Sequence, residues 1–342
     1  MVKIGLLGFG FMGGTHYQIY QNISGATVVG IFDLEPEKIK RGEITAGNID
    51  YGGAELDLTG VKITDTPEEL IESDTIDMID VCLPTYIHSE YVIKALNAGK
   101  HVLCEKPMAL NLEDCDAILE AAERAKKRLM IGHCVRFWPE YAVTKQILDK
   151  NTYGKVVSAF FKRVSPIPTW SYKDWILEEE KSGGALIDLH IHDTDYIAYL
   201  FGKPKEVLSF GRKNILNSNS GIDYVVTQYN FDVPLLVIAE GGWHFHSEFP
   251  FNMSFTIRCE KATIWFDSSQ ARTLAIFKED GTAEYPEVSK STGWDEEIKY
   301  FMDCVMNDKQ IEVSPPEAAR LALKIALAEI SSIENNTPVR IV

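Results

Sequence analysis

The feature that most constrains the fold is a glycine motif close to the start of the chain. Residues 2–7 are an apolar, strand-like run, and Gly-Phe-Gly-Phe-Met-Gly at 8–13 follows directly and opens a helix predicted over 12–22. The first glycine permits a tight turn, the second lets the backbone approach a pyrophosphate, and the third lets the helix pack closely on the strand. The helix N-terminus also offers unpaired N–H groups and the positive end of its dipole to phosphates. The motif therefore predicts a dinucleotide site that includes Gly8, Gly10, Phe11, Met12 and Gly13.

A carboxylate at the end of the second predicted strand indicates which dinucleotide binds. The apolar run 26–32 ends at Asp33, 20 residues after Gly13. A carboxylate there can accept hydrogen bonds from the adenosine ribose hydroxyls and would repel a 2′-phosphate. Leu34 follows, and no arginine is adjacent to receive such a phosphate. Asp33 as a simple helix cap is the alternative, but the spacing favours NAD over NADP.

The strand–helix alternation continues to about residue 134. Further strand-like segments occur at 61–63, 76–83, 101–104 and 129–132. Helices are predicted between them: one opens at Thr66-Pro67, one over 89–97 is ended by Gly99, and one is capped by Asn111. Repeated strand–helix–strand order implies a doubly wound parallel sheet with helices on both faces. We expect an α/β dinucleotide-binding Rossmann domain over residues 1–134.

The pattern changes in residues 135–342. A helix over 138–150 and a strand over 156–164 precede a helical segment within 182–201, and two helices, 294–307 and 314–334, close the chain. Between them lies a succession of strands separated by turns, among them 222–231, 235–243, 251–258 and 263–267. Consecutive strands with short connections favour a largely antiparallel, open sheet. We expect a second, α+β domain over 135–342 that serves the substrate and oligomerisation.

Charge and cysteine usage exclude several classes of partner. The chain has 34 Lys and Arg against 50 Asp and Glu, a formal net charge of -16. Such a surface repels phosphate backbones and anionic membranes, so neither nucleic acid nor a membrane is an expected partner. The six cysteines contain no CxxC pair and favour a reducing compartment. With no signal peptide before the first strand, and apolar runs too short to span a bilayer, a cytoplasmic location is predicted.

Four separated motifs together resemble one known family. They are GFGFMG at 8–13, PTYIH at 84–88, CEKP at 104–107 and GGALIDLHIHDTD at 183–195. In this order and spacing the chain resembles the glucose–fructose oxidoreductase, inositol dehydrogenase and rhizopine catabolism (Gfo/Idh/MocA) family of NAD(P)-dependent oxidoreductases, over nearly its whole length. The resemblance implies an enzyme that oxidises a secondary hydroxyl of a sugar, sugar derivative or cyclitol by hydride transfer to NAD.

The resemblance also implies roles for two loops at the carboxyl edge of the parallel sheet, where ligands bind in doubly wound folds. The first loop places Pro84, Thr85 and His88 at the cofactor, although His88 could simply start a helix. The family often has Asn where this chain has Tyr86, so the role of Tyr86 is open.

The second loop holds Glu105 and Lys106. The resemblance places Lys106 beside the nicotinamide and the reacting hydroxyl. An ammonium there stabilises the negative charge that grows on the alcohol oxygen, or relays its proton. A solvated surface lysine is the alternative. Lys106 also precedes Pro107, and X-Pro bonds are the ones that can be cis.

Asp188 and His192 complete the predicted chemical site. Four residues apart in a predicted helix, they share one face. The resemblance implies that His192 abstracts the hydroxyl proton, which suits an unperturbed pKa near 6.5, and that Asp188 supports it or contacts the substrate. His190 stands where the family commonly has glycine.

A metal site is a further hypothesis for the acidic and histidine residues of this segment. Asp188, His190, His192 and Asp195 lie close in sequence, but their spacing matches no closed zinc site and there is no HExxH. We expect no metal. The roles of His190, His244 and His246 stay open.

Two further residues are weaker candidates for substrate binding. Arg136 follows the sixth predicted strand, where the family often has a basic or polar residue. Trp170 precedes the GGALIDLHIHDTD motif, and aromatic faces stack well on sugars, although core packing of a loop is the slightly favoured alternative.

Two other functions remain open at this point. One is a dinucleotide-binding sensor or regulator without turnover, which would need none of Lys106, Asp188 and His192. The other is a glycosidase or sugar-interconverting enzyme that recycles its NAD; net release of NADH distinguishes it from a dehydrogenase. The resemblance further implies a homodimer or homotetramer that associates through the C-terminal sheet.

Overall fold

The computed structural model describes residues 1–41, 47 and 56–342, and these fall into two compact units. The first unit contains Met1–Cys134, Thr169–Ile176 and Trp294–Arg320, and the second contains Val135–Pro168, Leu177–Gly293 and Leu321–Val342. The N-terminal segment of the first unit ends at Cys134. Two later segments, however, pack with the first unit although the sequence assigned them to the second domain.

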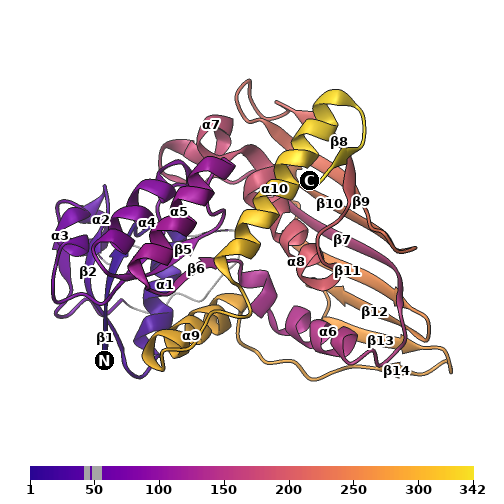
Figure 1. Cartoon of the computed structure of the whole chain (residues 1–342), viewed down its shortest axis with the longest axis horizontal. Coiled ribbons are helices and arrows are strands. Elements are labelled where there is room, and N and C mark those ends of the chain that lie inside the picture. Colours follow the sequence, from indigo (N-terminus) through magenta and orange to yellow (C-terminus); the bar gives the residue numbers. More distant parts are fainter. Residues whose placement is uncertain (42–46, 48–55) are drawn as a thin grey trace. The chain divides into compact units, whose positions relative to one another are not determined.

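In the first unit the described residues form a six-stranded sheet with the strand order β3-β2-β1-β4-β5-β6 (Figure 1). All of its pairs are parallel. This is the doubly wound order typical of dinucleotide-binding folds, so the predicted Rossmann sheet is confirmed. The strands are β1 (Val2–Leu7), β2 (Ala26–Phe32), β3 (Lys62–Thr64), β4 (Met78–Val81), β5 (His101–Glu105) and β6 (Leu129–Gly132).

Helices connect these strands, as the alternation predicts. They are α1 (Phe11–Gln21), α2 (Pro36–Lys40), α3 (Glu68–Ile71), α4 (His88–Asn97) and α5 (Leu112–Ala125), and α9 (Gly293–Met306) joins them from the far end of the sequence. Asn111 caps α5 as predicted, because its side chain accepts a hydrogen bond of 2.8 Å from the Asp114 N–H. The predicted Thr66 cap is wrong: α3 begins at Glu68, and the Thr66 N–H instead donates to the Glu69 carboxylate.

The first core lies where the parallel strands are buried on both faces. All residues of β4 and β6 are buried, and Ile4, Leu6 and Leu7 of β1 have no exposed surface. Such strands read as continuous apolar runs, which is why the sequence located them. α9 joins this unit through Trp294, whose ring packs edge-on against Phe11 at a centroid distance of 5.9 Å.

In the second unit the described residues form a nine-stranded sheet in the order β14-β13-β12-β11-β7-β10-β9-β8-β15. Its pairs are antiparallel except for β7 with β10, so the largely antiparallel sheet is confirmed as a mixed one. The strands are β7 (Val156–Pro166), β8 (Glu206–Lys213), β9 (Ile222–Asn230), β10 (Leu236–Phe245), β11 (Asn252–Cys259), β12 (Ala262–Asp267), β13 (Leu274–Lys278), β14 (Ala283–Glu284) and β15 (Val339–Arg340).

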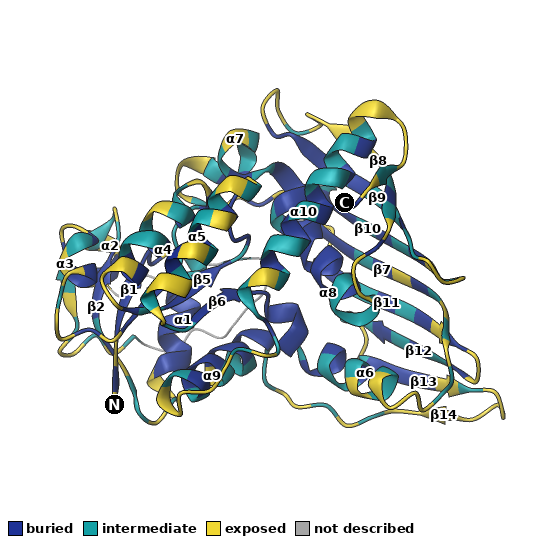
Figure 2. Cartoon of the chain, in the orientation of Figure 1, coloured by how far each residue is buried: buried dark blue, intermediate teal, exposed yellow. Residues whose placement is uncertain are grey.

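Helices cover one face of this sheet. α6 (Pro139–Asp149) packs the Tyr141 ring against Phe255 and Phe266, and α8 (Ile191–Phe201) packs Tyr196 near Phe161. The second-unit part of α10 (Pro316–Asn335) adds a hydrogen bond of 2.9 Å from the Ser209 N–H to the Ser332 hydroxyl. Residues on this face are buried while those between them are partly exposed, as the alternating colours along the strands show (Figure 2). The side chains between them form the other, outward face.

No helix in the described part of the chain is long and apolar enough to cross a membrane.

Candidate active site

The glycine motif forms a tight turn between β1 and α1. Gly8 has φ +88°, in the left-handed region that favours glycine, and a Cβ on Gly13 would lie 2.0 Å from the Gly8 carbonyl oxygen. A Cβ on Gly10 would meet no atom of the described residues within 4 Å. The fold therefore requires glycine at positions 8 and 13, whereas Gly10, with Phe11 and Met12 beside it, leaves open backbone at the helix N-terminus.

Asp33 ties the end of β2 to this turn. Its Oδ2 accepts a hydrogen bond of 2.6 Å from the Phe9 N–H, and its Oδ1 accepts one of 2.7 Å from the Glu35 N–H. The second bond closes a turn before α2 and does not cap that helix, whose N-cap residue is Glu35. The first bond fixes the carboxylate beside the glycine turn. Its contact with the ribose stays a prediction.

The loop after β4 is held by His88. This residue begins α4 and is buried, with Nδ1 2.8 Å from the Pro107 carbonyl oxygen and Nε2 2.7 Å from that of Leu83. Burial lowers the pKa of His88 below its ordinary value. His88 thus joins the two loops at the carboxyl ends of β4 and β5. Thr85 beside it is also buried, Pro84 is half-buried, and Tyr86 is exposed.

Lys106 follows β5 directly, and the Lys106–Pro107 peptide bond is cis. The Lys106 N–H donates a hydrogen bond of 3.1 Å to the Glu105 Oε2, and the lysine itself is half-buried. Burial raises the pKa of Glu105, but the hydrogen bond from His16 and the charges of His16 and Lys106 outweigh it, so the pKa lies below its usual value. The first unit therefore holds a lysine beside an ionised carboxylate at the carboxyl edge of its sheet.

The second unit carries Asp188 and His192. The sequence predicts one helical segment here, but the chain forms a short helix α7 (Glu179–Ser182), a π-helix over Leu186–His190, and then α8. Gly183 and Gly184 have φ +78° and +69°, and a Cβ on Gly184 would lie 2.9 Å from the Ser220 carbonyl oxygen, so these glycines break the helix. Asp188 lies in the π-helix and is half-buried, and His192 lies in the first turn of α8 and is 9% exposed. Single π turns are frequent at functional sites.

A buried hydrogen-bond network holds the π-helix, and His190 is its centre. His190 Nε2 lies 3.1 Å from the Tyr229 hydroxyl and 3.2 Å from Glu329 Oε2. Thr194 closes the network, 3.0 Å from the Tyr229 hydroxyl and 3.1 Å from Glu329 Oε1. A Cβ on Gly241 would lie 2.5 Å from His190 Nδ1, so the ring fits only against glycine. This placement supports a structural role for His190, which the sequence left open.

Two arginines form ion pairs with the acidic residues that follow. Arg136 binds Asp195 with two hydrogen bonds of 2.7 and 2.6 Å, and Arg163 binds Asp193 with two of 3.0 and 3.2 Å. Both pairs are buried, so they anchor α8. The Arg136 guanidinium already binds Asp195. The predicted contact between Arg136 and the substrate stays a prediction.

The remaining candidates belong to other segments of the chain. Trp170 belongs to the first unit and is half-buried. His244 belongs to β10, where its ring packs against Tyr224 at a centroid distance of 4.7 Å, and His246 follows that strand. Among the described residues, the side-chain clusters with the spacing of metal ligands centre on His16 in the first unit and include no residue of 188–195.

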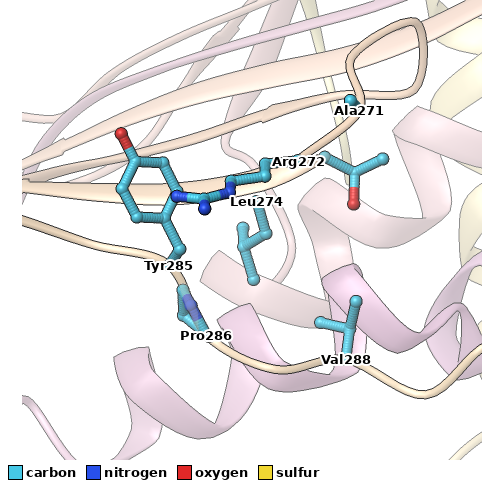
Figure 3. Close-up of a pocket in the computed structure, with 7 residues that line it drawn as sticks. Ala271, Arg272, Leu274, Tyr285, Pro286 and Val288 are labelled. Carbon is cyan, nitrogen blue, oxygen red and sulfur yellow. The ribbon is translucent and has the colours of Figure 1, made fainter.

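A pocket of about 440 Å³ opens in the second unit beside β13 (Figure 3). The Arg272 guanidinium lies over the Tyr285 ring, 4.7 Å from its centroid. No residue predicted from the motifs lines this pocket, so it is separate from the candidate site. Its lining is Ala271, Arg272, Thr273, Leu274, Tyr285, Pro286 and Val288.

Comparison with known proteins identifies the family. Residues 2–133 match the model of an oxidoreductase family with an NAD-binding Rossmann fold, and residues 141–265 match the model of the Gfo/Idh/MocA C-terminal domain. The chain belongs to the Gfo/Idh/MocA family of NAD-binding oxidoreductases. The resemblance found in the four motifs is thus confirmed, and so is an NAD-binding Rossmann domain.

The chain is similar to several known proteins, some of them over nearly its whole length. A myo-inositol 2-dehydrogenase from Thermotoga maritima is 26% identical over 99% of this chain and 98% of its own. A 2,7-anhydro-N-acetylneuraminate hydratase from Escherichia coli is 29% identical over 65% of this chain and 55% of its own. The crystal structure of a probable dehydrogenase from Thermotoga maritima has a TM-score of 0.79, with 25% identity over 99% of both chains.

The sequence analysis missed one group of buried polar residues in the first unit. His16, Asp80 and Glu297 have no exposed surface, and all three lie near Glu105. A signal for Glu297 was present: it falls on the apolar stripe of its helix, three residues after Trp294 and four before Phe301. A charged residue on a buried stripe predicts a partner in the core.

Proposed function

We propose that this protein is a dehydrogenase that oxidises a secondary hydroxyl of a sugar, sugar derivative or cyclitol with NAD. The observation that carries the proposal is Lys106, which follows β5 of an NAD-binding Rossmann domain beside a buried carboxylate. The full-length match to an inositol dehydrogenase supports this class of substrate.

The proposed chemistry divides three tasks among three side chains. NAD accepts the hydride when it is bound. His192 accepts the hydroxyl proton, and Asp188 orients His192 or contacts the substrate. Lys106 stabilises the negative charge that develops on the substrate oxygen. We further propose NAD rather than NADP, because the Asp33 carboxylate is fixed beside the glycine turn and repels a 2′-phosphate.

Three wider expectations remain proposals. The dinucleotide and substrate functions are proposed to divide at residues 134 and 135. The protein is proposed to act in the cytoplasm, and to form a homodimer or homotetramer through the sheet of the second unit.

The test is NADH formation against a panel of sugars, sugar acids and inositols, with NAD and NADP in parallel. Lys106→Ala should lower kcat by roughly 10²–10⁴-fold, the usual contribution of a positioned acid–base group. Lys299→Ala is the matched control, because its side chain is 50% exposed and pairs only with Glu296 of its own helix turn in the contacts described. Turnover that survives Lys106→Ala would contradict the role of Lys106.

One observation favours a second candidate. A hydratase adds water without net oxidation, and an enzyme of that name is among the relatives. An NAD-binding relative could reach the same outcome by oxidising and then reducing its substrate on one bound cofactor. Substrate consumption without accumulation of NADH, lost in Lys106→Ala, would support this recycling function over the dehydrogenase.

A further inference from the structure

Five ionisable side chains meet in the core of the first unit, and the Cys82 thiol lies beside them, 3.5 Å from His16 Nδ1 and 3.6 Å from Asp80 Oδ1. His16 and Tyr20 come from α1, Asp80 from β4, Glu105 from β5 and Glu297 from α9. All five are buried, and His16, Asp80 and Glu297 have no exposed surface. We call these five residues the buried acid cluster.

Two of the three carboxyl groups in the cluster are well supplied with donors. Asp80 Oδ2 lies 2.9 Å from His16 Nδ1 and accepts a hydrogen bond of 2.8 Å from the Tyr20 hydroxyl. Glu105 Oε1 lies 3.2 Å from His16 Nε2, and its Oε2 accepts the Lys106 N–H. Glu105 Oε1 makes no hydrogen bond to a described residue, and the positive charge of His16 beside it takes that place. Hydrogen-bond donors or a nearby positive charge thus stabilise the ionised form of both carboxylates.

Glu297 is different. Both of its carboxyl oxygens are buried and make no hydrogen bond to any described residue. An oxygen of Glu297, an oxygen of Glu105 and a nitrogen of His16 lie within 4.8 Å of one another. One bridging water can span such a separation. A negative charge on Glu297 would therefore be buried beside a second carboxylate without a donor of its own.

The charge balance of the cluster leads to the same conclusion. The ionisable groups around Glu297 are His16 and Tyr20 on α1, Asp80 on β4 and Glu105 on β5. The His16 imidazolium and the Lys106 ammonium, whose charge also acts on Glu105, supply at most two positive charges for three carboxylates. Like charges at short range then keep a proton in common. Asp80 and Glu105 have donors, so the proton belongs on Glu297.

We propose that Glu297 keeps its proton at neutral pH and acts as a positioning residue, which leaves Glu105 as the single carboxylate beside Lys106. A neutral Glu297 does not repel Glu105, so Glu105 keeps the hydrogen bond that it accepts from the Lys106 N–H. The effect on Lys106 rests on the proposed function, whereas the proton on Glu297 does not. Burial, and then the charge of Glu105, raise the pKa of Glu297 well above its ordinary value, in agreement with this geometry.

The proton has a consequence for stability. A carboxyl group whose pKa is raised on folding binds its proton more tightly in the folded state than in the unfolded one. Stability is then greatest below the ordinary pKa of 4.5 and falls as pH rises from there toward the raised, folded-state pKa. Glu297→Gln keeps the shape of the neutral acid and has no proton to lose, so it should escape this fall.

The experiment compares wild type with Glu297→Gln and with Glu296→Gln, a matched control on the same helix whose side chain is 41% exposed. Infrared difference spectra at neutral pH should show the C=O stretch of a protonated carboxyl in wild type and Glu296→Gln and its loss in Glu297→Gln. The Tm of Glu297→Gln relative to wild type should rise between about pH 5 and about pH 8, and that of Glu296→Gln should not.

Three results would overturn the proposal. The first is the absence of that band from wild type, which needs no variant. The second is a Glu297→Gln protein that fails to fold, or whose Tm at neutral pH is well below that of Glu296→Gln. Such a loss would mean that the wild-type protein needs a negative charge on Glu297, which this change removes. The third is a stoichiometric metal in the purified protein that Glu297→Gln releases, since His16, Glu105 and Glu297 would then be its ligands.

Activity separates positioning from a merely structural role. Glu297→Ala should lower kcat for NADH formation by up to about 10²-fold, the cost of misplacing a catalytic group by about 1 Å. Glu297→Gln should rescue most of that loss. Equal losses in both variants contradict positioning through a neutral acid. If wild type forms no NADH on any substrate, the proposed function fails, while the infrared and melting results still decide the state of Glu297.

Discussion

At the scale of single residues, burial decides which charged side chains serve the fold and which stay available for chemistry. The buried ion pairs Arg136–Asp195 and Arg163–Asp193 neutralise side chains whose roles could not be predicted from the sequence alone. Lys106 and Asp188, in contrast, are half-buried, as groups that meet a ligand need to be. The difference follows from their places: the ion pairs fix α8, whereas Lys106 ends a strand and Asp188 lies in a π turn.

The Arg136–Asp195 pair gives a prediction for stability. Arg136→Leu would remove the guanidinium that forms an ion pair with Asp195, whose side chain is 1% exposed. We expect a loss of about 3–5 kcal/mol, measured by urea unfolding. Arg124→Leu is the control, because Arg124 and Glu120 form an exposed pair at 3.6 Å and should contribute at most about 1 kcal/mol. Equal losses in both variants would contradict the prediction. Adding Asp195→Leu to Arg136→Leu should restore part of the loss.

His101 gives a prediction for pH. Its Nδ1 accepts a hydrogen bond of 3.1 Å from the Arg128 N–H, which requires a neutral ring. Burial, followed by the charges of Lys127 and Arg128, lowers the pKa of His101 from 6.5 to about 4. The unfolded chain therefore takes up the proton first, and stability falls as pH drops from 6.5 to about 4. His101→Gln should show a weaker fall in Tm over this range. Parallel curves for the two proteins would argue against it.

At the scale of elements, the glycines of the β1–α1 turn differ in what their positions require. Gly13 is required by the close approach of α1 to the Gly8 carbonyl, whereas a Cβ on Gly10 would meet none of the described residues within 4 Å. Packing therefore explains Gly13, and a role of Gly10 at the ligand stays a prediction.

Gly10→Ala and Gly13→Ala should separate these tasks. Gly13→Ala should lower Tm, because its Cβ would lie 2.0 Å from the Gly8 oxygen. Gly10→Ala should leave Tm nearly unchanged but weaken NAD binding measured by calorimetry, since the added methyl group blocks the approach of the pyrophosphate. If Gly10→Ala binds NAD as tightly as wild type does, the predicted path of the pyrophosphate is wrong.

At the scale of the whole molecule, the second unit presents a sheet face with exposed apolar side chains. Phe160 on β7, Phe210 on β8 and Phe277 on β13 are 44%, 62% and 45% exposed. Helices cover the opposite face, so these side chains point away from the core. Exposed aromatic side chains on one sheet face are the kind of surface through which protein chains associate, so we propose that copies of this chain associate through this face.

Sedimentation velocity tests whether this face joins copies of the chain. Wild type should sediment as a dimer or tetramer at micromolar concentration, and Phe160→Glu with Phe210→Glu should shift it toward the monomer. Phe249→Glu is the control, because Phe249 is 38% exposed but lies in the loop after β10. A clean wild-type monomer would remove the proposed association.

The sequence by itself determined the features that depend on local order. The Rossmann sheet, the glycine turn, the Asn111 cap and the strands of the second sheet follow from apolar periodicity and from residues with special backbone geometry, which act over a few positions. The π-helix at Asp188 could not be predicted this way, because it depends on His190 meeting Tyr229 and Glu329 from distant elements.

Tertiary structure alone decided which polar residues share an environment. Helix α9 packs with the first unit, although its sequence follows the second sheet, and so brings Glu297 to His16 and Glu105. The ionisation of a carboxyl group depends on the charges, donors and water around it, and those come from elements far apart in the chain. The sequence therefore determined where strands and helices form, and the packing of those elements decided which of their side chains carry charge.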